Sequence, residues 1–146
     1  MSRTEEQTFE NHAKMVPLFH FVASPLLILC LFYFGWRTVT DFSGDRLAFM
    51  GVLVYLLILG FYARTFALGV QDRVIRLEER LRLQRLLPEE MRGRLPELTT
   101  RQLIALRFAS DEEVVELASR VLDGELTRQK EIKAAVRSWR PDYERV

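Results

Sequence analysis

Residues 47–63 read LAFMGVLVYLLILGFYA, seventeen positions in a row without a charge. Residues 64–87 follow without a proline, and Gly69 is the only glycine among them. An α-helix rises about 1.5 Å per residue, so the uncharged run makes up most of a membrane span, and Arg64 marks its edge. We therefore predict one long helix, with a span at about 47–67 and an amphipathic stalk at 71–87.

Charge is distributed unevenly along the chain of 146 residues. Although 28% of all residues are charged, residues 15–63 contain four charges, Arg37, Asp41, Asp45 and Arg46. An apolar half followed by a charged half indicates a membrane-anchored protein, with the lipid bilayer as its first partner. The net charge of +1 gives no general attraction to nucleic acid, which we do not expect as a partner.

A second apolar run lies nearer the N-terminus. Residues 15–36 read MVPLFHFVASPLLILCLFYFGW, and twenty-two residues of helix reach about 33 Å, enough to cross a hydrocarbon core of about 30 Å. A signal peptide would have a shorter apolar core and then small residues, whereas this run ends in the bulky FYFGW, residues 32–36. We predict a retained span at about 16–36, with a kink at Pro25.

The connection between the two runs is short. Residues 38–46 read TVTDFSGDR, with the Gly, Ser and Asp residues that are typical of a turn. The two spans are therefore predicted to form an antiparallel transmembrane hairpin within residues 15–70. Segment 1–14 before it is polar and is expected to be frayed or to lie on a surface.

Lys and Arg residues near the ends of the spans predict the orientation of the hairpin, because cytoplasmic flanks are enriched in them. The largest group follows the second span and comprises Arg64, Arg73, Arg76, Arg80 and Arg82. This excess predicts a cytoplasmic C-terminus. With two spans, the N-terminus is then cytoplasmic too.

The stalk has apolar residues at the helical spacing 4, 3, 4, namely Val70, Val74, Leu77 and Leu81. Glu78 and Arg82 are four apart and are predicted to pair. The apolar pattern covers fewer than three heptads, which is too short to indicate a coiled coil by itself. The stripe is expected to pack on the protein's own tail, with self-association in a dimer and contact with the membrane surface as alternatives.

Residues 88–98, with two prolines and a glycine, are predicted to be a linker, and residues 99–146 a small three-helix module. Capping boxes at Thr99–Gln102 and Ser110–Glu113 predict the starts of two helices, and a third is predicted from Thr127 to Pro141. The apolar residues of these helices form the predicted core: Leu103, Leu106, Phe108, Val114, Leu117, Val121, Leu126, Ile132, Val136 and Trp139. The fold class is thus an all-α membrane protein.

The opening and the tail of the chain resemble a family of short bacterial membrane proteins, a domain of unknown function. The matching residues are Asn11, His12, Pro17, His20 and Phe21, the run IALRFASDEE at 104–113, and Ile132, Lys133 and Trp139. The resemblance covers nearly the whole chain. It implies a multi-pass protein of the bacterial cytoplasmic membrane with a helical tail in the cytoplasm, and it brings no activity, cofactor or substrate.

His20 and Arg64 form a candidate polar site within the membrane. In an antiparallel hairpin His20 lies level with Ala63, one position from Arg64, near the cytoplasmic edge. Ionisable groups inside a membrane indicate a proton or anion site. The structural alternative is an Arg that reaches the interface and a His that hydrogen-bonds to a neighbour.

A candidate contact with an anionic surface lies on the predicted last helix. Its residues are spaced 3, 4, 3: Lys130, Lys133, Arg137 and Arg140. Such a stripe suits the phosphates of lipid or nucleic acid. Residues 95–146 nevertheless contain nine basic and ten acidic residues, so a solvated face is the alternative.

The sequence has no pattern typical of a catalytic or metal centre, and we predict no enzyme, cofactor or metal site. His12 and His20, even with Glu10 nearby, lack the carboxylate spacing of a metal site. Cys30 is the single cysteine, so it forms no internal disulfide.

The function predicted from the sequence is a membrane anchor that presents a small cytoplasmic helical module to a protein partner or to further copies of itself. One alternative is an oligomeric transporter or channel component that uses His20 and Arg64. The other is a membrane-tethered binder of anionic lipid or nucleic acid.

Overall fold

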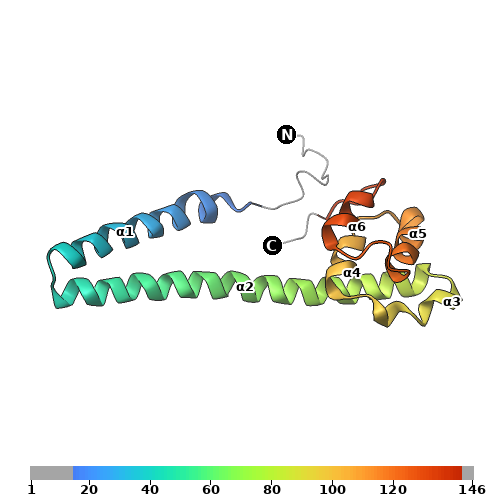
Figure 1. Cartoon of the computed structure of the whole chain (residues 1–146), viewed down its shortest axis with the longest axis horizontal. Coiled ribbons are helices and arrows are strands. Elements are labelled where there is room, and N and C mark those ends of the chain that lie inside the picture. The colour runs from blue at the N-terminus through green and yellow to red at the C-terminus, as the bar shows by residue number, and fades with distance from the viewer. Residues whose placement is uncertain (1–14, 143–146) are drawn as a thin grey trace. The chain divides into compact units, whose positions relative to one another are not determined.

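The computed structural model describes residues 15–142, which are mainly helical and contain no strand (Figure 1). The predicted polar segment 1–14, including His12 and Glu10, lies outside the described residues. The helical elements in chain order are a π-helical segment Leu18–Ala23, α1 Ser24–Thr40, α2 Gly44–Leu86, α3 Glu89–Arg92, a 3₁₀ segment Leu95–Glu97, α4 Thr100–Leu106, α5 Asp111–Leu122 and α6 Gln129–Ala135.

The described residues divide into two compact units, an N-terminal unit at 15–67 and a C-terminal unit at 68–142. Helix α2 contributes to both, because it runs for 43 residues. The prediction of one long helix through this region is therefore confirmed.

The π-helical segment Leu18–Ala23 leads directly into α1, and this wider turn ends just before Pro25. Proline has no N–H to donate to the preceding turn, and such turns are a common way for a helix to accommodate this loss. The carbonyl oxygen of Phe19 in the wide turn accepts both the backbone N–H of Ser24 and, at 2.8 Å, its hydroxyl.

The connection between α1 and α2 is shorter than predicted, because it comprises residues 41–43 rather than 38–46. Helix α1 continues through Thr38 and Thr40, whose hydroxyls donate to the carbonyls four residues back at 2.7 and 3.0 Å. Ser43 then begins α2, since its hydroxyl oxygen accepts the backbone N–H of Arg46 at 3.3 Å.

The two helices are in contact close to this connection. The rings of Phe34 and Phe49 lie 4.6 Å apart between centroids. A Cβ added to Gly35 would lie 3.2 Å from the terminal methyl of Met50, so glycine allows this approach. Small residues at such a point let two apolar helices pack closely.

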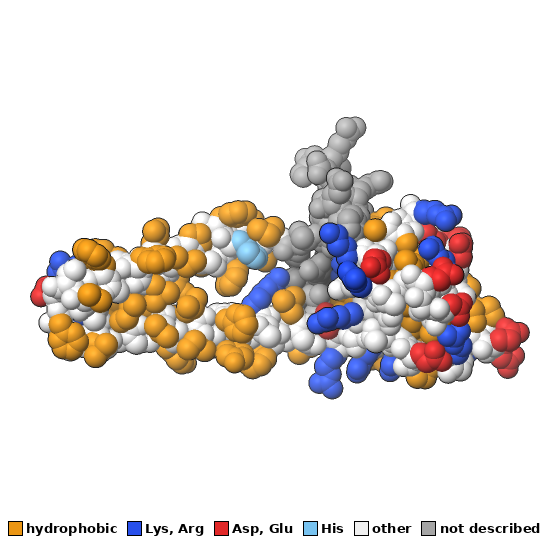
Figure 2. All heavy atoms as spheres, in the orientation of Figure 1, with side chains coloured by type: hydrophobic (Ala, Val, Ile, Leu, Met, Phe, Trp, Pro, Cys, Tyr) orange, Lys and Arg blue, Asp and Glu red, His pale blue; other side chains and the backbone are white. Residues whose placement is uncertain are grey.

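Most of the apolar side chains of the N-terminal unit are exposed (Figure 2). Both the helix Leu18–Thr40 and α2 are long and apolar enough to cross a membrane. In the most apolar stretch of the first helix no residue is buried. In the corresponding stretch of α2, 6% of the residues are buried.

The C-terminal unit has its own buried core, to which α2 contributes Leu83 and the residue just after α2 contributes Leu87. The other core residues come from the segments after α2: Leu95, Leu98, Leu103, Ala105, Leu106, Ala109, Val114, Leu117, Ala118, Val121 and Ile132. The segment 88–98 is thus more than a linker, because its leucines are buried and it holds two short helical elements.

The tail packs on a face of α2 other than the predicted one. Side chains of α2 that are buried include Ile75, Glu79, Arg82 and Leu83. The predicted stripe remains exposed, with Val70, Val74, Leu77 and Leu81 between 49% and 62% accessible. The expectation that this stripe covers the tail is therefore wrong.

Helix α4 begins with the predicted capping box. The hydroxyl of Thr99 accepts the backbone N–H of Gln102, and the Gln102 side chain accepts that of Thr99. The second predicted box, at Ser110, does not form, although α5 does begin at Asp111. The Glu113 carboxylate is bonded elsewhere.

Glu113 explains why α6 is shorter than predicted. Its two carboxylate oxygens accept the backbone N–H groups of Arg137 and Ser138, each at 2.8 Å. Helix α6 ends at Ala135, and the chain turns back so that residues 109 and 139 form an isolated antiparallel bridge. The ring of Trp139 stacks on Phe108 at 4.5 Å, inward as predicted but from outside the helix.

Candidate functional site

The C-terminal unit is organised around the guanidinium group of Arg82, which is 6% exposed on α2. Its Nε and Nη2 lie 2.7 and 2.6 Å from Oδ1 of Asp111, at the start of α5. Nη2 also donates to the carbonyl oxygen of Ala109 at 2.7 Å, and Nη1 lies 3.1 Å from the Glu79 carboxylate. One side chain thus joins α2 to α5 and to the segment before it.

Glu79 is itself buried, at 5% exposure. Burial raises the pKa of its carboxyl above the usual 4.5, although the charge and hydrogen bond of Arg82 act in the opposite direction. A second cation, Arg140, lies 3.7 Å away and offsets part of the cost of burying this charge. The predicted partner of Arg82 was Glu78, and the structure has Glu79 in its place.

A second buried arginine, Arg107, lies next to Phe108. Its Nε is 3.2 Å from the Asp142 carboxylate, and its guanidinium carbon is 4.5 Å from the centre of the Phe108 ring. Lys133 Nζ lies 5.0 Å from the centre of the same ring. Cation–π contacts of this kind stabilise charges that are partly removed from water.

These residues line a groove of about 980 Å³ between α2 and the segments 107–112 and 140–142. Its lining carries both signs of charge: Glu78, Glu79, Asp111, Glu112 and Asp142 against Arg82, Arg85, Arg107 and Arg140. The hydrogen bond from Arg82 holds the pKa of Asp111 below its usual value, and the Ser110 hydroxyl does the same for Glu112. The groove is therefore lined by charges of both signs, most of which already have partners.

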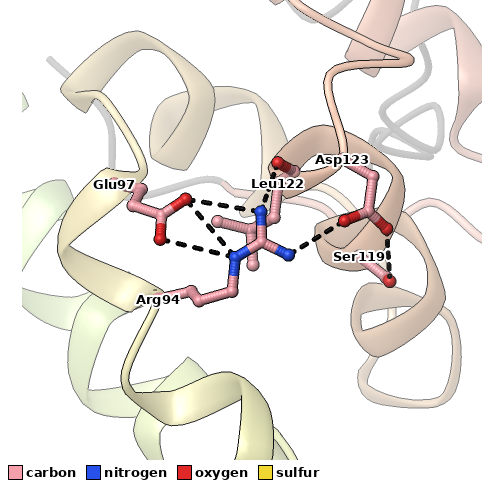
Figure 3. Close-up of polar contacts among 5 residues, drawn as sticks. All are labelled: Arg94, Glu97, Ser119, Leu122 and Asp123. Atoms are coloured by element: carbon pink, nitrogen blue, oxygen red, sulfur yellow. Dashed lines mark hydrogen bonds and ion pairs between the residues drawn. The ribbon is translucent and has the colours of Figure 1, made fainter.

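A separate exposed cluster joins the segment after α3 to the end of α5 (Figure 3). Arg94 donates to the Leu122 carbonyl at 2.6 Å and to Asp123 at 2.9 Å, and it contacts Glu97 at 3.4 Å. The Arg94 hydrogen bond lowers the pKa of Asp123. Because Arg94 satisfies the carbonyl of the last residue of α5, this cluster has a structural role as a C-terminal cap.

The structure places no hydrogen bond or ion pair between His20 and Arg64 among the described residues. Nδ1 of His20 lies 2.9 Å from the carbonyl oxygen and 3.1 Å from the amide nitrogen of Val16, and its ring meets Phe19 edge-on at 5.2 Å. The histidine is thus bonded to its own helix, as in the structural alternative above. A role for His20 and Arg64 as a proton or anion site stays a prediction.

The four residues of the predicted basic stripe do not share one helix face. Lys130 and Lys133 lie on α6, whereas Arg137 and Arg140 follow its end. Lys133 is placed over the Phe108 ring and Arg140 beside Glu79. The helical spacing that indicated a stripe is therefore absent, and binding of an anionic surface by these residues stays a prediction.

Sequence reasoning missed Glu79, Arg107 and Asp142 as partners at the groove. The signal for Glu79 and Arg82 was weak but present: they are three apart, with Ile75 and Leu83 on the same side of the helix. No pattern could have indicated Arg107 and Asp142, because 35 residues separate them.

Comparison with known protein families shows which family the chain belongs to. A family model described as a family of unknown function (DUF6526) matches residues 1–146. The chain belongs to this family. The resemblance to a domain of unknown function is confirmed, and the family has no assigned activity to transfer. Searches of the curated proteins and of the solved structures gave no match.

Proposed function

We propose that this DUF6526 member is a multi-pass protein of the bacterial cytoplasmic membrane that presents its C-terminal unit to a cytoplasmic protein partner. The helix Leu18–Thr40 and the first half of α2 form a transmembrane hairpin in this proposal, with both termini in the cytoplasm. The lipid covers the apolar side chains that the protein leaves exposed.

The observation that supports this proposal most is the continuity of α2. One helix of 43 residues begins with exposed apolar side chains and ends inside the core of the C-terminal unit. Sharp kinks in helices occur most often at proline, and α2 contains none. One continuous helix therefore connects the apolar part of the chain to the core of the C-terminal unit.

The groove is the proposed docking surface. Because its lining carries both signs of charge, it suits a protein surface with both signs better than a polyanion, which the acidic residues of the lining would repel. Rim charges of this kind contribute more to the choice of partner than to affinity.

The test combines membrane extraction with crosslinking and capture. The tagged full-length chain should resist alkaline carbonate extraction and co-purify with a partner after crosslinking in native membranes. Glu112→Arg reverses an exposed charge of the groove and should remove that partner. Glu116→Arg reverses an exposed charge of the same helix outside the groove and should retain it.

Two results would contradict the proposal. Release of the wild-type chain by carbonate would show that it is not an integral membrane protein. An identical set of captured proteins for Glu112→Arg and the wild type would show that the groove does not bind the partner.

A further inference from the structure

The exposed stripe of α2 has the spacing of a coiled-coil seam. Its members are Val70, Val74, Leu77 and Leu81, with exposed fractions of 62%, 49%, 60% and 53%. Spacings of 4, 3 and 4 correspond to the heptad positions d, a, d and a. Large apolar side chains at such positions, in a segment rich in charge, indicate a surface that a second helix covers.

The C-terminal unit leaves this seam accessible. The core-facing side chains of the same stretch are Ile75, Glu79, Arg82 and Leu83, none more than 6% exposed. At about 100° per residue, the centre of this buried face lies roughly opposite the centre of the seam. Helix α2 thus turns one face to its own chain and leaves the seam exposed, and the two meet at Leu81, which also lines the groove.

We propose that two copies of this protein pair in parallel through this seam, burying Val70, Val74, Leu77 and Leu81 against their counterparts. This inference rests on the proposed membrane anchoring. Two copies held in one bilayer with the same orientation have parallel α2 helices, so equivalent seam residues meet without any further alignment.

The charges beside the seam support a second copy as the occupant. In a parallel pair a residue at position g faces the residue at position e five places further along the other helix. This rule places Arg73 opposite Glu78 of the second copy, an attractive pair. The next pair joins Arg80 to Arg85, two like charges, so the pairing is expected to be modest in strength.

The same register continues toward the membrane in the sequence. Positions a, d and a before Val70 are Gly60, Ala63 and Ala67. Small residues let helices approach closely in lipid, where large ones are not needed to exclude water. A Cβ added to Gly60 would have no heavy atom within 4 Å, so this position is open to a second helix.

Disulfide crosslinking in native membranes tests the proposal. In a Cys30→Ser background, Val74→Cys and Leu77→Cys should each give a disulfide-linked dimer under mild oxidation. Arg76→Cys lies on the same turn but points away from the seam, and it should crosslink severalfold less. Equal crosslinking at the three positions, or none at any, would overturn the proposal.

Charge reversal tests the register of the two α2 helices without introducing a cysteine. R73E and E78R should each lower the dimer fraction measured by chemical crosslinking, and the double variant R73E/E78R should restore it. L77E should remove the dimer. If L77E remains as dimeric as the wild type, the copies meet elsewhere and the seam proposal is wrong.

Carbonate extraction of the same samples separates this proposal from the proposed function. A wild-type chain that stays in the membrane but is monomeric contradicts the pairing alone. A chain that is released contradicts the anchoring on which the pairing rests.

Discussion

The charge of Arg82 is neutralised almost entirely by groups of its own chain. It contacts Glu79 on α2, Asp111 on α5 and the Ala109 carbonyl, and it is nearly inaccessible to solvent. Loss of one member of a buried ion pair is costly because the other charge remains buried. Arg82 is therefore the residue on which attachment of α2 to α5 depends most.

Replacing Arg82 by Met should lower the free energy of unfolding of the C-terminal unit by about 3–5 kcal/mol, the usual cost of breaking a buried pair. Unfolding in detergent micelles can be followed by fluorescence of Trp139 in a Trp36→Phe background. Arg85→Met, an exposed neighbour, should change stability by less than about 0.5 kcal/mol. A loss below about 1 kcal/mol for Arg82→Met would contradict this role.

The two carboxylates bound to Arg82, those of Glu79 and Asp111, should change the stability of the protein with pH in opposite directions. Burial raises the pKa of Glu79, so folding binds a proton there, and stability falls as pH rises above about 4.5 through the folded pKa. The Arg82 hydrogen bond lowers the pKa of Asp111, so its contribution is present above about 3.8 and is lost as pH falls.

Denaturation measured across this pH range checks both signs. E79Q should remove the loss of stability above pH 4.5, and D111N should flatten the loss at acid pH. A wild-type stability that rises through the range above 4.5, with no change of slope in E79Q, would show that burial does not raise the pKa of Glu79.

At the scale of the element, helix positions followed from the sequence better than helix ends. The capping box predicted the start of α4, and the absence of proline predicted the length of α2. The end of α6 could not be predicted, because Glu113, more than twenty residues earlier, accepts the N–H groups that follow Ala135. The core face of α2 was missed because two of its members, Glu79 and Arg82, are charged.

Glu113→Ala should release the backbone around residues 137 and 138. Two hydrogen bonds to a carboxylate are lost, each worth about 1.5–3 kcal/mol at most, and much less where water replaces the acceptor. Amide hydrogen exchange at Arg137 and Ser138 should therefore accelerate strongly. Glu116→Ala serves as the control, and equal protection in wild type and Glu113→Ala would contradict the account of how α6 ends.

The two glycines Gly69 and Gly124 should respond to alanine with opposite signs. Gly69 lies inside α2 with no atom within 4 Å of an added Cβ, so Gly69→Ala should stabilise the helix by about 0.5–1 kcal/mol. Gly124 has a φ of +81° after α5, so Gly124→Ala should destabilise by about 1 kcal/mol. Thermal unfolding of both variants checks the pair, and a gain for Gly124→Ala would contradict the structure of this turn.

For the whole molecule, the sequence predicted an all-helical chain with two long apolar helices, and the structure confirms both. The groove could not be predicted, because it brings together residues 75–85, 107–112 and 140–142. Such long-range pairs leave no periodic signal in one sequence. The exposed seam was visible as a spacing, but its exposure depends on which face the tail covers.

The central claim is that the apolar helices form a hairpin with the connection on one side of the membrane and the C-terminal unit on the other. It is tested by labelling single cysteines with a membrane-impermeant maleimide in a Cys30→Ser background. Ser43→Cys, in the connection, should be labelled in intact spheroplasts, and Thr127→Cys, exposed in the C-terminal unit, only after permeabilisation. Labelling of Thr127→Cys in intact spheroplasts, or of both positions from the same side, would contradict the account.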